Sequence, residues 1–228
     1  MPVVKDARPA AVETREQPAA RLPGSGKRGG KRRRDIFKGL HDCVIAQGYA
    51  KTTLADVARA AGMSPSHLLY YFPGKDAILE QYFADVSLRI IERMRGFQAE
   101  DPERRIFLLA ELFFGGEKVT KSEIGFMLEC FGAAVHDKRL NREKTRLDRF
   151  CKAYLQNLFE QLPCGPARAK ACAEVSYAML VGLRTAAYFD ERLSPEQARG
   201  LFYTEVLNLA QLGRRGPAKK SRGRRDRS

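Results

Sequence analysis

The sequence lacks any hydrophobic run long enough to cross a membrane, and this absence limits where the protein can act. A membrane-spanning helix needs about 18 to 20 consecutive apolar residues, and no stretch of this 228-residue chain approaches that length. The N-terminal residues also lack the apolar segment of a secretory signal peptide. We therefore predict a cytoplasmic protein without a membrane partner, whose hydrophobic fraction of 44% is sufficient for a folded core.

Cysteine and histidine are too few and too scattered for a disulfide scaffold or a metal site. The five cysteines are odd in number and form no C-x-x-C pair, which argues against both. Buried packing is the expected role of such cysteines, and a redox-sensing thiol is the alternative. Three histidines, His41, His67 and His136, lie far apart in the sequence. We therefore expect no metal and no cofactor.

Acidic residues are scarce at both ends of the chain, and the whole net charge of +14 lies there. Residues 1–34 contain ten basic and three acidic side chains, residues 214–228 contain eight and one, and the part between them is neutral. Tails that are basic but carry no apolar face suit nucleic acid better than a membrane. Solvated ends that only aid solubility are the alternative. We predict disordered basic tails at 1–30 and 214–228.

The residues between the tails show helical rather than alternating periodicity, and proline and glycine fall at the boundaries. This pattern predicts an all-α fold. The expected helices span residues 33–47, 54–61, 65–72, 75–97, 103–115, 121–136, 140–161, 166–189 and 195–212.

Start and stop signals are clear around the second and third expected helices. Thr53 followed by Asp56 forms a capping box, and Ser64 is an N-cap followed by a proline. Gly48 ends the first expected helix, and Gly62 permits a sharp turn between the next two. Two short helices joined in this way form a helix-turn-helix, whose second helix enters the DNA major groove. A generic helical hairpin would need the same glycine, so the turn alone is weak evidence.

The sequence on both sides of this turn makes the prediction of a DNA-binding helix-turn-helix specific. Residues 34–79 contain G-Y-x-x-T-T beginning at Gly48, D-V-A-x-x-A-G-M-S beginning at Asp56, and Y-F-x-x-K-D-x-I-L beginning at Tyr71. This segment resembles the DNA-binding domain of the TetR family. The resemblance implies a three-helix DNA-binding domain at 31–77, followed at 78–213 by a helical effector-binding and dimerisation domain. It also implies a sequence-specific transcriptional regulator, usually a repressor, that binds a pseudo-palindromic operator as a homodimer and is released by a small-molecule effector.

The resemblance assigns DNA contacts position by position, and the assigned residues are Thr53, Ser64, Ser66, His67, Tyr70, Tyr71 and Lys75. Thr53 and Lys75 would meet phosphates, and the others would lie on the recognition helix. The alternatives are that Tyr71 and Phe72 are core aromatics and that His67 is merely solvated. Leu69 departs from the family, which usually has tyrosine there, so one phosphate contact is in doubt.

A basic run precedes the first expected helix and consists of Lys31, Arg32, Arg33 and Arg34. Such an arm can follow phosphates or enter the minor groove. It can equally bind any duplex without specificity.

The second half contains no G-x-S-x-G, phosphate-binding glycine loop or H-E-x-x-H motif, so we predict a binding domain and no enzyme. The expected effector pocket consists of Phe113, Phe126, Met127, Cys130, Phe131, Tyr154 and Tyr177, with Glu129 and His136 as further polar candidates. Plain core packing is the alternative for the aromatic and methionine side chains.

The last two expected helices are apolar on more than one face, and a second copy of the chain is the expected cover. The predicted dimer interface consists of Ala178, Gly182, Ala186, Leu201, Val206 and Leu209. A larger monomeric core is the alternative. Two rival functions also stay open: a nonspecific architectural DNA-binding protein driven by the tails, and an enzyme with an attached DNA-binding head.

Overall fold

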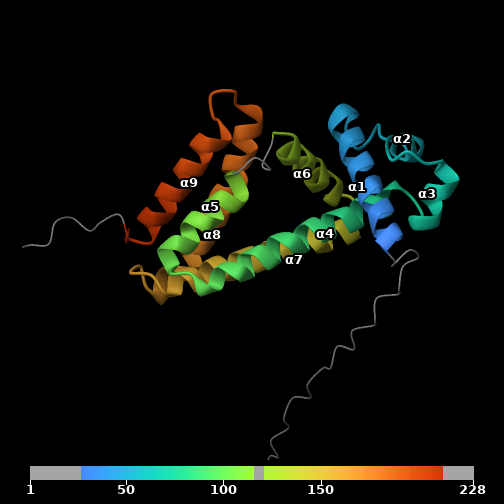
Figure 1. The fold of residues 1–228 in the computed structure, drawn as a ribbon. Helices are drawn as coiled ribbons and strands as arrows, with labels where there is room; N and C mark the ends of the chain where they lie inside the picture. Colours follow the sequence, from blue (N-terminus) through green and yellow to red (C-terminus); the bar gives the residue numbers. More distant parts are fainter. Residues whose placement is uncertain (1–26, 116–120, 213–228) are drawn as a thin grey trace, which may run out of the picture.

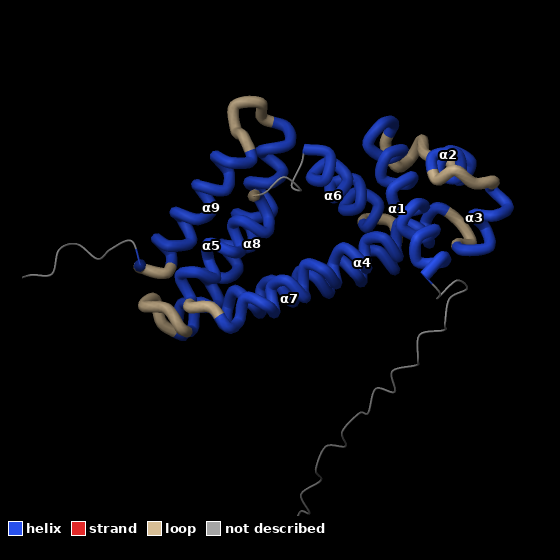
Figure 2. Tube along the Cα trace, viewed as in Figure 1, coloured by secondary structure: helices blue, strands red, loops and turns tan. Residues whose placement is uncertain are grey.

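The computed structural model describes residues 27–115 and 121–212, and these ranges contain helices and connecting turns without a β-strand (Figure 2). The prediction of an all-α fold is confirmed. The helices are α1 (Lys27–Gln47), α2 (Leu54–Ala60), α3 (Pro65–Tyr71), α4 (Lys75–Gly96), the 3-10 helix η1 (Phe97–Ala99), α5 (Pro102–Phe114), α6 (Lys121–Ala134), α7 (Lys138–Glu160), α8 (Pro166–Phe189) and α9 (Pro195–Leu209). The predicted tail at 214–228 and residues 1–26 of the predicted tail at 1–30 lie outside the described residues, whereas residues 27–30 belong to α1, so the prediction of disorder is wrong for these four residues.

The helices form two groups that α4 connects (Figure 1). Helices α1, α2 and α3 lie together at one end, and α4 runs from this group along α7. Helices α5, α8 and α9 pack together at the other end, while α6 contacts α1, α7 and α8. Because α6 touches both groups, it is placed to connect them mechanically.

The predicted local signals of the N-terminal group are confirmed. The Thr53 side chain accepts from the Asp56 amide, the Asp56 carboxylate accepts from the Thr53 amide at 3.0 Å, and the Ser64 side chain caps α3. Gly48 has a φ of 80° and Gly62 a φ of 63°. These left-handed conformations favour glycine because it carries no Cβ, and they end α1 and turn the chain into α3.

Helix α1 begins at Lys27 rather than near Arg33, so the prediction of a basic arm before the first helix is wrong. Lysine and arginine are favourable helix formers, which allows the helix to extend through this run. The Arg33 guanidinium also lies 5.1 Å from the centroid of the Phe72 ring. Arg32, Arg33 and Arg34 therefore occupy fixed faces of a helix instead of a loose strand.

The cysteines pack within the described core. Cys130, Cys151, Cys164 and Cys172 are buried, whereas Cys43 is half-buried, and all five are free thiols. Burial raises the pKa of Cys151 to about 12 and that of Cys130 above its ordinary value. A redox sensor reacts through its thiolate, so these two buried thiols suit packing rather than sensing.

Candidate DNA-binding surface and effector cavity

Helix α3 buries one face and exposes the other. Leu68 is fully buried, and it fixes the helix against the N-terminal core. Ser66 and His67 are exposed on the other side, together with Leu69 and Tyr70, which are 49% and 62% exposed. The outer face therefore carries polar, aromatic and apolar groups suited to the edges of bases.

The aromatic residues at the end of α3 divide between the surface and the core. Tyr71 is half-buried, and its ring centroid lies 5.3 Å from Tyr70 and 5.5 Å from His67. Phe72 is only 2% exposed, so the core alternative holds for Phe72. The cluster of Tyr71 with Tyr70 and His67 leaves Tyr71 bracing the exposed face of α3.

Lys75 lies at the start of α4, and much of its ammonium group is already engaged. Its Nζ donates to the carbonyl oxygens of Tyr49 at 3.0 Å and Thr52 at 2.9 Å, and lies 4.5 Å from the centroid of the Tyr49 ring. Two of three N–H donors thus fasten the α1–α2 turn to α4. The structure gives Lys75 a role in holding the domain together, which sequence reasoning missed.

Thr53 also serves the fold, because its hydroxyl donates to the Asp56 carboxylate at 2.6 Å. This bond and the one from the Thr53 amide lower the pKa of Asp56 below its ordinary value. Thr53 remains exposed at the start of α2. On α1, Arg32 and Arg34 are exposed and Arg33 is half-buried, so basic side chains lie on the helix that supports α2 and α3.

Two contacts join the N-terminal group to α6. The Tyr49 amide donates to Glu129 Oε2 at 3.0 Å, and the rings of His41 and Phe126 lie 4.9 Å apart between centroids. Glu129 and His136, predicted as pocket groups, line an open groove of about 730 Å³ beside Tyr49. Glu129 thus fastens the turn after α1, and a movement of α6 would pull on that turn.

Five of the seven predicted effector residues line one or both of two neighbouring cavities. Phe113, Met127, Phe131 and Tyr177 line an inner cavity of about 40 Å³ among α4, α5, α6, α7 and α8. Such a volume holds only a few water molecules. Neither cavity is lined by Cys130, which is fully buried, or by Tyr154, whose hydroxyl accepts from Arg105 Nε at 3.1 Å.

The second cavity is larger, about 500 Å³, and opens among α1, α4, α5, α6 and α8. Phe126 and Met127 were predicted from the sequence, whereas His41 and Arg184 were not. Ile90, Met127 and Arg184 line both cavities. The signal for Arg184 was available, because it is the one basic residue of the apolar run 175–189.

An apolar face of α8 and α9 is open to solvent. Val175 and Leu201 are each 48% exposed, Ala178 is exposed, and a Cβ added to Gly182 would meet nothing within 4 Å. Ala186 and Leu209 are partly exposed. Val206, also predicted at the dimer interface, is fully buried in the chain's own core. The prediction that Val206 lies at the dimer interface is therefore wrong, because the Val206 side chain faces inward from α9.

The ranges 27–115 and 121–212 contain no cluster of three or more His, Cys, Asp or Glu side chains that could hold a metal ion. Across the same residues, no helix has both the length and the apolar character that crossing a membrane demands.

Comparison with known proteins identifies both halves. Residues 36–82 match the family of bacterial regulatory proteins named tetR, and residues 102–210 match the C-terminal domain of BetI-type transcriptional repressors. The HTH-type transcriptional regulator BetI 2 of Chromohalobacter salexigens is 29% identical over 183 residues, covering 78% of this chain and 88% of that protein.

Solved structures share the fold at lower identity. A TetR transcription regulator from Haloarcula marismortui has a TM-score of 0.69 and 17% identity, covering 80% of this chain and 98% of that chain. A transcriptional regulator from Saccharomonospora viridis in complex with choline has a TM-score of 0.68 and 17% identity, covering 78% and 96%.

Proposed function

Because this chain belongs to the TetR family and carries a BetI-type C-terminal domain, we propose that it binds a pseudo-palindromic operator as a homodimer and that a small molecule releases it. The family makes it a DNA-binding, effector-regulated transcriptional repressor and not an enzyme. The observation that carries the proposal is the division of α3 between a fully buried Leu68 and an exposed outer face.

The outer face of α3 reads the operator. Ser66, His67 and Tyr70 are exposed on a helix that its own cap and Leu68 hold in place. Arg32 and Arg34 on α1 meet phosphates, and Lys75 does so through its third N–H donor. Contacts to base edges supply sequence preference, whereas contacts to phosphates supply affinity and register.

A second copy of the chain covers the exposed apolar face of α8 and α9. Small residues at Ala178 and Gly182 allow two helices to approach closely, and Val175 and Leu201 supply apolar area. Two such helix pairs form a four-helix bundle about a two-fold axis. This arrangement presents two α3 helices to DNA, with half-sites about 34–36 Å apart or somewhat more.

The dimer is tested by Leu201→Arg, which places a charge on the proposed face, against Val135→Arg as a matched exposed control on α6–α7. Analytical ultracentrifugation should give a monomer for the first and a dimer for the second. A dimeric Leu201→Arg protein would place the interface elsewhere.

A small molecule in the C-terminal cavities weakens operator binding by favouring another placement of α6. The Glu129–Tyr49 bond and the His41–Phe126 contact support this coupling, since both join the cavity-bearing domain to α1. A regulator of similar fold is in complex with choline, which supports a small-molecule ligand for this chain.

The function is tested by selecting bound duplexes from a random pool at about 0.15 M salt. Full-length protein is compared with residues 27–212, which lack the terminal basic segments. Enrichment of the same inverted repeat by both supports sequence reading by the helix-turn-helix. Binding of all duplexes by the full-length chain, with no enriched motif, supports the rival architectural function, which the +14 net charge favours.

A further inference from the structure

The cavity of about 500 Å³ has the size of a ligand site and an apolar lining on one side. Pockets for small molecules measure about 300–1,000 Å³ and combine apolar walls with few polar groups. The Tyr82 and Phe126 rings meet edge to face at 5.0 Å, and Leu112, Ile90 and Met127 extend the same wall. This wall suits the apolar body of a small molecule.

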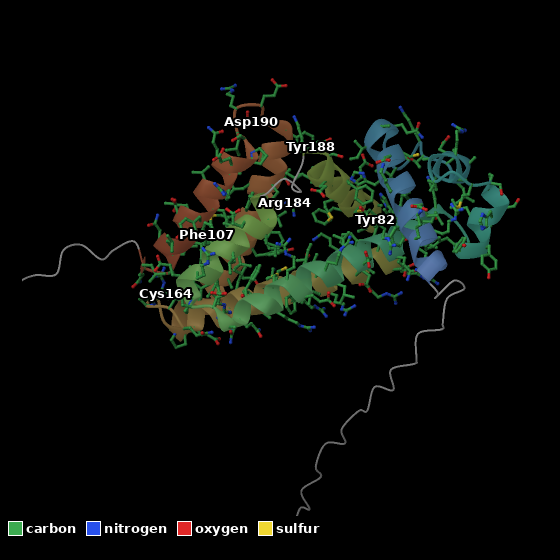
Figure 3. All side chains as sticks on the ribbon, viewed as in Figure 1. Tyr82, Phe107, Cys164, Arg184, Tyr188 and Asp190 are labelled. Carbon is green, nitrogen blue, oxygen red and sulfur yellow. The ribbon has the colours of Figure 1, made fainter. Side chains whose placement is uncertain are left out.

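Two polar atoms at this cavity are buried without a hydrogen-bond partner. They are Nε of Arg184 on α8 and Nε2 of His41 on α1. A buried polar group without a partner is costly, and the Arg184 Nε–H can only donate, so it favours a ligand that supplies an oxygen acceptor. Figure 3 labels Arg184 inside the C-terminal group and Tyr82 nearer the DNA-binding domain.

The Arg184 guanidinium is the stronger of the two groups. Burial lowers its pKa below the ordinary value, and the nearby Glu123 and Tyr177 only oppose this shift. Its Cζ lies 5.9 Å from the centroid of the Phe113 ring, and it lines both the inner and the outer cavity. Arg184 is half-buried at the junction of the two cavities, and its positive charge is stabilised by an anion that enters either of them.

The charges around Arg184 leave the outer cavity positive. Its wall carries Arg89, Arg93 and Arg184 against Glu123. Asp85 pairs with Arg89 at 3.2 Å, which leaves two guanidinium groups facing one carboxylate. Asp148 in the inner cavity is already engaged by Lys144 at 2.6 Å and by the Tyr177 hydroxyl.

We infer that the effector of this protein is a small carboxylate with an apolar body, whose carboxylate binds Arg184 and whose body lies against Tyr82 and Phe126. His41 Nε2 contributes a second polar contact from α1. The ligand thus touches the DNA-binding domain directly as well as α6 and α8. This inference rests on the proposed function, and it separates this protein from the choline-bound regulator of similar fold, since choline is a cation.

The test compares four probes on the full-length protein by calorimetry and thermal unfolding: hexanoate, hexanamide, hexylammonium and choline. The first three each contain six carbons in an unbranched chain and end in an anionic, a neutral and a cationic head group. Hexanoate should bind about 10- to 100-fold more tightly than hexanamide, the ratio for a hydrogen bond to a charged partner. Tighter binding of hexylammonium or choline than of hexanoate would overturn the inference.

Arg184→Leu should abolish the preference for hexanoate over hexanamide, and Arg184→Lys, which keeps the charge, should retain part of it. Circular dichroism establishes that both variants fold. Arg146→Leu removes an exposed arginine of α7 and should leave the preference unchanged. An unaltered preference in folded Arg184→Leu would also overturn the inference. Operator selection without ligand tests the proposed function separately. The carboxylate site can therefore be disproved while the proposal of operator binding still holds.

Discussion

The DNA-facing helix and the ligand-facing cavities hold their functional side chains by different kinds of contact. Around α3, the supporting contacts are local: Ser64 caps the helix that contains Leu68, and Thr53 pairs with Asp56 three residues later. Around the cavities, they join distant segments, as in the hydrogen bond from the Tyr177 hydroxyl to Asp148 and the ring contact between Tyr82 and Phe126. The helix-turn-helix is thus specified within a short sequence motif, whereas a ligand site depends on how whole helices pack.

The largest effect is expected at Leu68 of α3, and the adjacent Leu69 serves as its control. Leu68→Ala removes a fully buried side chain and should lower the free energy of unfolding by about 2–5 kcal/mol. Leu69→Ala, at a position 49% exposed, should change it by about 0.5 kcal/mol or less. Denaturant unfolding measures both. Similar losses for the two variants would mean that α3 packs with another face inward.

The next prediction concerns the hydrogen bond between the buried side chains of Arg105 and Tyr154 in the C-terminal group. Tyr154→Phe removes the acceptor of Arg105 Nε, where both residues are buried. Leaving that donor unpaired should cost about 1–3 kcal/mol of unfolding free energy. Tyr70→Phe, the exposed control, should have no measurable effect on the isolated protein. Equal stability of Tyr154→Phe and the wild type would show that this long-range bond does not support the cavity-bearing domain.

The same difference between local and long-range contacts decides which features could be predicted from the sequence. The caps at Thr53 and Ser64 and the glycine turns follow from residues within a few positions of each other, so the helix-turn-helix was predicted with its boundaries. Arg184 and His41 line one cavity only because α1 and α8 both pack against α6. No local pattern encodes that arrangement, although a lone arginine in an apolar run was a usable signal.

The errors have the same origin. Val206 reads as one more apolar residue of α9, and only the position of α5 and α8 around that helix decides that it faces inward. The second role of Lys75 was missed for the same reason, because its approach to two carbonyl groups of the preceding turn depends on how α4 meets α1. Sequence patterns therefore gave the exposed face of α3 more reliably than the direction of side chains between helices.

A smaller effect is expected from restoring the tyrosine that the family usually has at Leu69. Leu69→Tyr places a hydroxyl on the exposed face of α3. One added hydrogen bond to a phosphate should tighten operator binding by about 0.5–1.5 kcal/mol, and the salt dependence should stay the same because a neutral hydroxyl neutralises no phosphate. Fluorescence anisotropy measures the affinity, with Leu69→Phe as the control that adds a ring without a hydroxyl. Equal affinities of Leu69→Tyr and Leu69→Phe would mean that the hydroxyl at this position does not reach the DNA backbone.

The smallest effect concerns Asp56 and should depend on pH. The Thr53 hydrogen bonds lower the pKa of Asp56, so the folded state favours the charged carboxylate. This stabilisation is present above the ordinary pKa of 3.8 and is lost as the pH falls through the lower value of the folded state. Asp56→Asn should therefore be less stable than the wild type near neutrality, and the difference should shrink in acid. A difference that is constant with pH in thermal unfolding would contradict this account.

The central claim is that the outer face of α3 reads DNA sequence, and one measurement tests it most directly. Duplexes selected by His67→Ala should be compared with those selected by the wild type from the same random pool. If His67 contacts a base, the variant keeps the inverted repeat but relaxes its preference at one symmetric position in each half-site, by about 1–3 kcal/mol. An unchanged motif for His67→Ala, and likewise for Ser66→Ala and Tyr70→Ala, would contradict the claim that this face reads the operator.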